Sequence, residues 1–126
     1  MAEIKVEESV KYEQLIGGAD PAPLQEILTI TAGQGILKRG SVLGISTADG
    51  KAKLVDSSVS DGSEVAKYIL AEEVDTTTEV NAPAFMAGIF NEEYLTFGGT
   101  DTVDKHKTAL RDVGIFLTSE KYYEEA

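Results

Sequence analysis

Closely spaced turn signals divide most of this chain into apolar runs that are too short for ordinary helices. Between residues 27 and 117 the signals are Gly33-Gln34-Gly35, Lys38-Arg39-Gly40, Asp49-Gly50, Asp61-Gly62 and Gly98-Gly99. Ahead of the first signal, Leu28 and Ile30 alternate with Thr29 and Thr31, which is the period of a half-buried strand. Asp49-Gly50 favours a hairpin with a type I′ turn, in which both central residues have positive φ. The sequence therefore predicts a mainly β domain of short strands over residues 27–118.

Further strands are predicted where apolar residues gather between the turns. We expect them at residues 68–71, 80–82, 85–90, 94–97 and 115–117, with residues 72–78 as an exposed connection. One short helix near the C-terminus should begin at Asp101 or Thr102, either of which can cap it, and should end at Gly114. One side of this helix would carry Val103, Lys107 and Leu110.

Both ends of the chain differ in composition from this central part. Residues 1–26 contain Gly17-Gly18, Pro21 and Pro23 and have too few apolar residues for a core of their own, so we predict a flexible N-terminal arm. Its apolar side chains would be available for contacts with a partner. Residues 119–126 are predicted to be a polar C-terminal tail.

Length and charge exclude several classes of function. A chain of 126 residues is expected to form one domain, and 11 basic against 22 acidic residues give a net charge of −11. That charge argues against nucleic-acid partners and anionic membranes, both of which need clustered Lys and Arg. No apolar run approaches the roughly 20 residues of a membrane span, and no signal peptide is expected after Met1.

The residues that could carry chemistry form no catalytic pattern. There is no Cys, and the single His, His106, is expected on the charged surface of the helix. Gly33-Gln34-Gly35 lacks the rest of a phosphate-binding loop and is interpreted as a turn. Ser41, Ser46 and Ser57 have no nucleophile-elbow motif around them. We therefore expect no catalytic residue, no metal and no cofactor, and favour an interaction or structural protein.

Several runs, in order and at matching spacing, resemble the head decoration proteins of tailed bacteriophages, the group of phage lambda protein D. They are residues 32–44 (AGQGILKRGSVLG), 61–63 (DGS), 69–71 (ILA), 74–77 (VDTT), 87–91 (AGIFN), 95–97 (LTF) and 114–117 (GIFL). The resemblance covers residues 27–118, and the tail extends beyond the point where the family's final strand ends.

The resemblance implies a structural protein of the virion with a small β-clip-like fold and no enzymatic activity. It would be made in the host cytoplasm and bind the major capsid protein as a homotrimer, at threefold and quasi-threefold sites outside the expanded head. There it would stabilise the shell against the pressure of packaged DNA. The arm would become ordered on the capsid and add a strand to the coat protein. Its expected anchors are its apolar residues Ile4, Val6, Val10, Tyr12, Leu15 and Ile16.

Two other interpretations remain open from the residues alone. A small cytoplasmic β domain that binds a small ligand would need a concave apolar pocket. An enzyme that uses Glu72, Glu73 or Asp75 would need a carboxyl group with a perturbed pKa in a cleft. Trimer contacts cannot be assigned from the sequence, and the candidates are Tyr94, Phe97 and the apolar side of the helix over residues 102–111.

Overall fold

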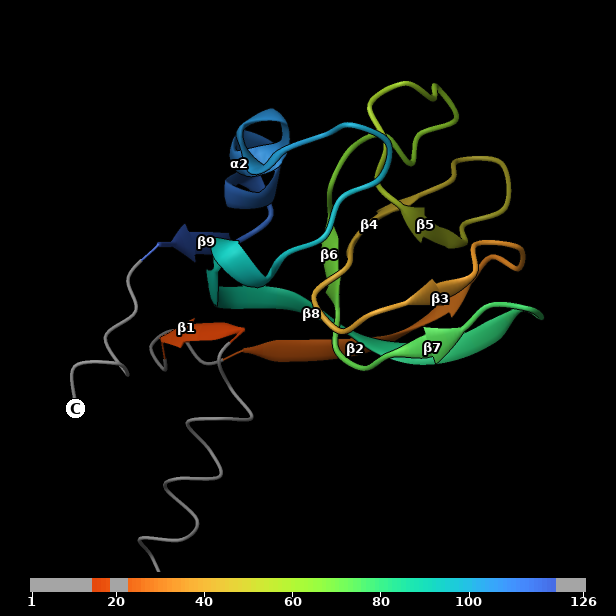
Figure 1. The fold of residues 1–126 in the computed structure, drawn as a ribbon, viewed down its shortest axis with the longest axis horizontal. Helices are drawn as coiled ribbons and strands as arrows, with labels where there is room; N and C mark the ends of the chain where they lie inside the picture. Colours follow the sequence, from red (N-terminus) through yellow and green to blue (C-terminus); the bar gives the residue numbers. More distant parts are fainter. Residues whose placement is uncertain (1–14, 19–22, 120–126) are drawn as a thin grey trace, which may run out of the picture.

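The computed structural model describes residues 15–18 and 23–119, and it is mainly β (Figure 1). The strands are β1 (Ile16–Gly18), β2 (Leu24–Ile30), β3 (Ile36–Leu37), β4 (Val42–Ile45), β5 (Ala52–Leu54), β6 (Tyr68–Leu70), β7 (Val74–Asp75), β8 (Val80–Asn91) and β9 (Ile115–Thr118). A 3₁₀ turn, η1 (Glu92–Tyr94), follows β8, and α2 (Val103–Asp112) precedes β9. The predicted fold class, mainly β with one short helix near the C-terminus, is confirmed.

Five of these strands close into a small barrel. The order is β8-β2-β5-β4-β6, and β6 pairs back onto β8 through Ile69 with Phe85 and Leu70 with Ala84. Residues paired across the strands, such as Leu28 with Ala82 and Leu43 with Leu54, contribute to one apolar cluster. Leu28, Ala82 and Leu43 are almost fully buried and Leu54 is half-buried, so apolar side chains pack across the barrel interior.

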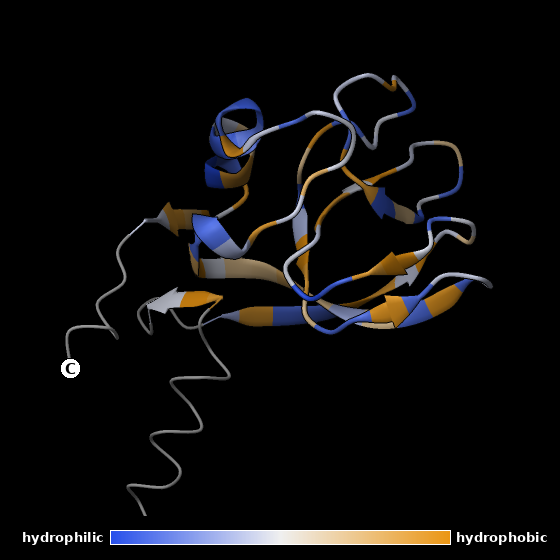
Figure 2. Cartoon of the chain, in the orientation of Figure 1, coloured by the Kyte–Doolittle hydropathy of each residue, from blue (hydrophilic) through white to orange (hydrophobic). Residues whose placement is uncertain are grey.

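A second apolar cluster lies outside the barrel wall. Phe85, Ile69 and Val42 point away from the interior and pack with Leu110 of α2 and Ile115 of β9. Phe85 and Phe90 meet there with ring centroids 5.1 Å apart. β9 runs parallel to the end of β8, and α2 covers this side of the molecule (Figure 1). Figure 2 shows α2 as largely hydrophilic, which is expected of a helix that buries one narrow stripe.

β8 is one continuous strand where two were predicted, at residues 80–82 and 85–90. The strand continues through Pro83 because the sheet tolerates a proline at this position. Pro83 lies opposite Ile27 of β2, and its carbonyl accepts a hydrogen bond of 3.0 Å from the Ala71 N–H. In an antiparallel strand, the N–H and C=O of one residue point to the same side. The missing N–H of Pro83 is therefore on the side of β6, which has already ended at Leu70.

Three local predictions were wrong. Residues 72–78 are not only a connection, since they contain β7, which pairs with β3. Residues 94–97 form no strand; Tyr94 ends η1 and Thr96 makes an isolated bridge to Ser41. The hairpin at Asp49-Gly50 exists, but only Gly50 has positive φ, so the turn is not type I′. Asp49 instead accepts a 3.1 Å hydrogen bond from the Lys51 N–H within a longer loop.

Candidate functional site

The point where the N-terminal segment enters the sheet is fixed by the chain's own core. The Leu15 side chain is 4% exposed within the second cluster, and its carbonyl accepts a 2.7 Å hydrogen bond from the Asn91 N–H. β1 then pairs antiparallel with β8. Gly17 permits this approach, because a Cβ there would lie 2.5 Å from the Thr118 methyl group and 3.1 Å from the Phe90 carbonyl carbon.

The predicted anchors therefore divide into two groups. Leu15 and Ile16 were expected to contact the capsid, but the structure packs Leu15 inside the domain and Ile16, half-buried, against the same cluster. Both side chains therefore contact the core of their own domain, and burial of Leu15 stabilises the fold. Ile4, Val6, Val10 and Tyr12 lie outside the described residues. β1 and the first residues of β2 also belong to the sheet, although they fall within the segment assigned to the arm.

A surface groove of about 230 Å³ lies beside this entry point. It is lined by Ile16, Pro23, Gln25, Arg39, Ala71, Glu72, Pro83 and Phe85. The Arg39 guanidinium donates a 2.8 Å hydrogen bond to the Ala71 carbonyl and lies 5.6 Å from the centre of the Phe85 ring. A hydrogen bond to the backbone and a cation–π contact therefore place the Arg39 guanidinium at this groove.

Large apolar side chains remain exposed on β2, β8 and β9. Ile27 and Leu24 of β2 are 66% and 56% exposed, and Phe116 of β9 and Met86 of β8 are about 40% exposed. Across the sheet, Leu24 lies opposite Ala87, and Phe116 lies beside Ile89. Apolar surface of this kind commonly marks contacts with other proteins. Of the candidate trimer contacts, Tyr94 is exposed, whereas Phe97 is half-buried.

His106 is buried, so the prediction of a surface histidine was wrong. It shares the inner stripe of α2 with Val103 and Leu110, at spacings of three and four residues, and stacks on Phe97 with centroids 5.3 Å apart. Its Nε2 lies 2.7 Å from Asp101 Oδ2. Lys107, which had been expected on that stripe, is exposed.

Asp101 connects His106 to a distant loop and does not cap the helix. Its carboxylate accepts hydrogen bonds from the Ser57 N–H at 2.7 Å and the Ser57 hydroxyl at 2.6 Å. Thr102 occupies the N-cap position without a side-chain hydrogen bond. The Ser57 hydroxyl and then His106 lower the pKa of Asp101 to about 2, so the carboxylate is ionised at neutral pH.

This constellation is a structural clamp and not a catalytic triad. A triad needs the histidine between the hydroxyl and the acid, so that it can remove the hydroxyl proton. Here the acid stands in the middle, and both the Ser57 hydroxyl and His106 bind to Asp101. Because a carboxylate only accepts, His106 donates from Nε2.

The acidic residues considered for an active site do not converge. Glu72, Glu73 and Asp75 are exposed around β7, and hydrogen bonds from Thr77 lower the pKa of Asp75. Within the described residues, no group of three or more His, Cys, Asp or Glu could hold a metal ion. The N–H groups of Gly33 and Gln34 donate to Thr76, which supports the interpretation of that loop as a turn. No helix in the described part of the chain has the length and apolar character to cross a membrane.

These features define a small β-barrel protein with a filled interior and exposed apolar side chains on β2, β8 and β9. Comparison with protein families gives a match to the bacteriophage lambda head decoration protein D over residues 4–116. The chain belongs to this family, whose members are structural proteins of the phage head. It is therefore a capsid decoration protein of a bacteriophage virion. A comparison with curated proteins finds no match.

The Asp101 clamp is the feature that sequence reasoning missed most completely. The spacing of Val103, His106 and Leu110 could have placed the histidine on the buried stripe. The hydrogen bond between Ser57 and Asp101 could not have been predicted from residue spacing, because the two residues are 44 positions apart in the chain.

Proposed function

We propose that this protein binds as a homotrimer to the outer surface of the expanded capsid, at threefold and quasi-threefold sites, and stabilises the shell against internal DNA pressure. The observation that carries the proposal is the family match, which begins at residue 4 and so includes most of the N-terminal arm. The major capsid protein would be the partner, with no role for nucleic acid, membrane or enzymatic activity. The net charge of −11 would keep the free protein soluble before assembly.

The arm is proposed to bind by adding a strand to the coat protein. In Ile4-Lys5-Val6-Glu7, the apolar and charged residues alternate, so an extended strand would present Ile4 and Val6 on one face. Val10 and Tyr12 would be further anchors. Main-chain hydrogen bonds would then supply affinity, and the alternate side chains would supply specificity.

Trimer formation would make this attachment tight. Ordering an arm costs roughly 1–2 kcal/mol per residue, so a single arm should bind weakly. Three arms on one trimer raise the effective concentration of the second and third binding events. Exposed Tyr94 and the exposed apolar residues of β2 and β9 are candidates for the contacts between protomers or with the shell.

Removal of residues 1–14 tests the role of the arm. The deletion must stop before Leu15, because that side chain belongs to the core of the domain. We expect the shortened chain to sediment as a trimer with an unchanged circular dichroism spectrum, and not to pellet with expanded, undecorated shells. A matched Ile4→Asp/Val6→Asp variant should show the same loss while retaining the full length. Undiminished binding by both proteins would contradict the proposed role of the arm.

A further inference from the structure

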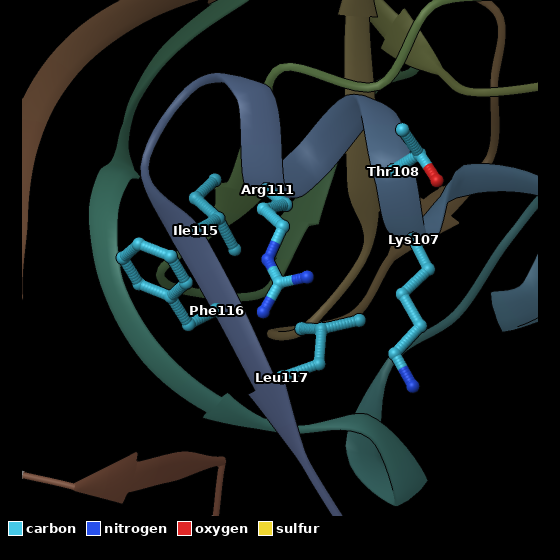
Figure 3. Close-up of a pocket in the computed structure, with 6 residues that line it drawn as sticks. All are labelled: Lys107, Thr108, Arg111, Ile115, Phe116 and Leu117. Atoms are coloured by element: carbon cyan, nitrogen blue, oxygen red, sulfur yellow. The ribbon is translucent and has the colours of Figure 1, made fainter.

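A second surface pocket, of about 340 Å³, lies between α2 and β9. Lys107, Thr108 and Arg111 line it from the helix, and Ile115, Phe116 and Leu117 line it from the strand. Figure 3 shows the Lys107 and Arg111 side chains extending from α2 toward β9. The pocket therefore combines two cationic groups with apolar side chains of β9, of which Phe116 is also among the candidates for contacts between protomers or with the shell.

The charges of this pocket are incompletely balanced by the domain. Lys107 and Arg111 are four residues apart on one helix face, where like charges repel each other. The Lys107 Nζ lies 3.9 Å from a Glu92 carboxylate oxygen, and no residue of the described segments forms an ion pair with Arg111. In a chain with a net charge of −11, such a pair of cations indicates an anionic ligand.

The floor of the pocket indicates that the ligand also has apolar groups. Phe116 is 40% exposed, and Leu117 beside it is half-buried. A simple anion would leave this surface in contact with water. A peptide that carries both acidic and aromatic residues would satisfy the cations and cover the strand at the same time.

The C-terminal tail of the chain has this composition and begins beside the pocket. Residues 120–126 (EKYYEEA) contain three glutamates and two tyrosines, and only Ser119 separates them from the end of β9. Seven extended residues reach at most roughly 25 Å, whereas the four residues of β9 span roughly 13 Å. The tail is therefore long enough to turn back along the strand. It also lies beyond the family match, which ends at residue 116.

We propose that the pocket between α2 and β9 binds the chain's own C-terminal tail. In this arrangement the tail glutamates lie against Lys107 and Arg111, and Tyr122 or Tyr123 packs on Phe116. The tail then covers apolar surface that the described domain leaves exposed. This inference stands whether or not the protein binds capsids, because it concerns contacts within one chain.

Disulfide trapping tests the proposal directly, because the chain has no natural cysteine. The full-length protein would carry Thr108→Cys in the pocket and Ala126→Cys in the tail, which preserves every charge and both tyrosines. The control pair is Asp49→Cys with Ala126→Cys, since Asp49 lies in the loop between β4 and β5, away from α2 (Figure 1). We expect the pocket pair to form an intramolecular disulfide about tenfold faster than the control pair.

Charge reversal separates specific binding from random encounters of the tail. Lys107→Glu/Arg111→Glu in the pocket pair should reduce trapping to the rate of the control pair. Lys67→Glu/Lys105→Glu changes the net charge equally at exposed positions outside the pocket and should leave trapping fast. A tail variant, Glu120→Lys/Glu124→Lys/Glu125→Lys, should also slow trapping, and it leaves the sequence of the described domain unchanged.

Three results would overturn the inference. Equal trapping rates in the pocket and control pairs would show that the tail has no preference for the pocket. Fast trapping that survives both sets of charge reversals would remove the ionic basis of the contact. Disulfide-linked dimers in place of intramolecular bonds would assign the pocket to the tail of a second copy.

Discussion

Asp101 ties together segments of the chain that are far apart in sequence. The buried carboxylate receives hydrogen bonds from Ser57, which follows β5, and from His106 in α2. The ring of His106 in turn packs on Phe97, which precedes the helix. The clamp therefore holds α2 in place over the second apolar cluster, on the side of the molecule that carries β9.

We predict that His106→Ala destabilises the fold by about 1–3 kcal/mol, because it removes a hydrogen bond to a buried carboxylate and the stacking on Phe97. Urea denaturation followed by circular dichroism would measure the change. Lys105→Ala, at the exposed neighbouring position, should change the free energy of unfolding by less than about 0.5 kcal/mol. Equal effects of the two substitutions would contradict the clamp.

Acid should weaken the same clamp. The folded-state pKa of Asp101 is about 2, below its ordinary value of 3.8, so the unfolded chain binds the proton more readily. The stabilisation by Asp101 is therefore complete above pH 4 and is lost as the pH falls toward 2. Melting temperatures between pH 5 and pH 2 should fall more for the natural protein than for Asp101→Asn. Parallel curves would show that Asp101 does not couple folding to pH.

At the scale of elements, β1 is the segment whose role differs most from expectation. It joins the sheet through β8, and Leu15 just before it is buried in the core. We predict that Leu15→Ala destabilises the domain by about 2–5 kcal/mol, the usual cost of removing a buried leucine. Ile27→Ala, at a position 66% exposed, should cost less than about 0.5 kcal/mol in the same denaturation experiment. A small effect at Leu15 would place it outside the folded core.

Alternating apolar residues predicted β2, and short apolar runs between turn signals predicted β6 and β9. These local patterns did not predict the elements that form only through pairing with distant parts of the chain. Pro83 interrupts the pattern but lies where β6 has ended, so β8 continues through it. Val74 and Asp75 form a strand only because β3 lies beside them. Closure of the barrel likewise depends on long-range pairing of β6 with β8.

At the scale of the whole molecule, a filled barrel with exposed apolar side chains on β2, β8 and β9 suits a protein that works through contacts with other proteins. Apolar side chains pack across its interior, and the pocket between α2 and β9 is lined by cationic as well as apolar groups. The proposed capsid-binding role of Ile4, Val6, Val10 and Tyr12 remains a prediction. The family itself was predicted from ordered turn and core motifs and is confirmed by the match over residues 4–116.

The most direct test of the account is to mix the full-length protein with expanded, undecorated shells of the phage that encodes it. Sedimentation would show how much protein pellets with the shells, and heating would show the temperature at which the shells break. We predict that the protein pellets in multiples of three copies at threefold and quasi-threefold sites and that decorated shells survive to a higher temperature. A monomer that stays in the supernatant and leaves the breaking temperature unchanged would contradict the proposed function.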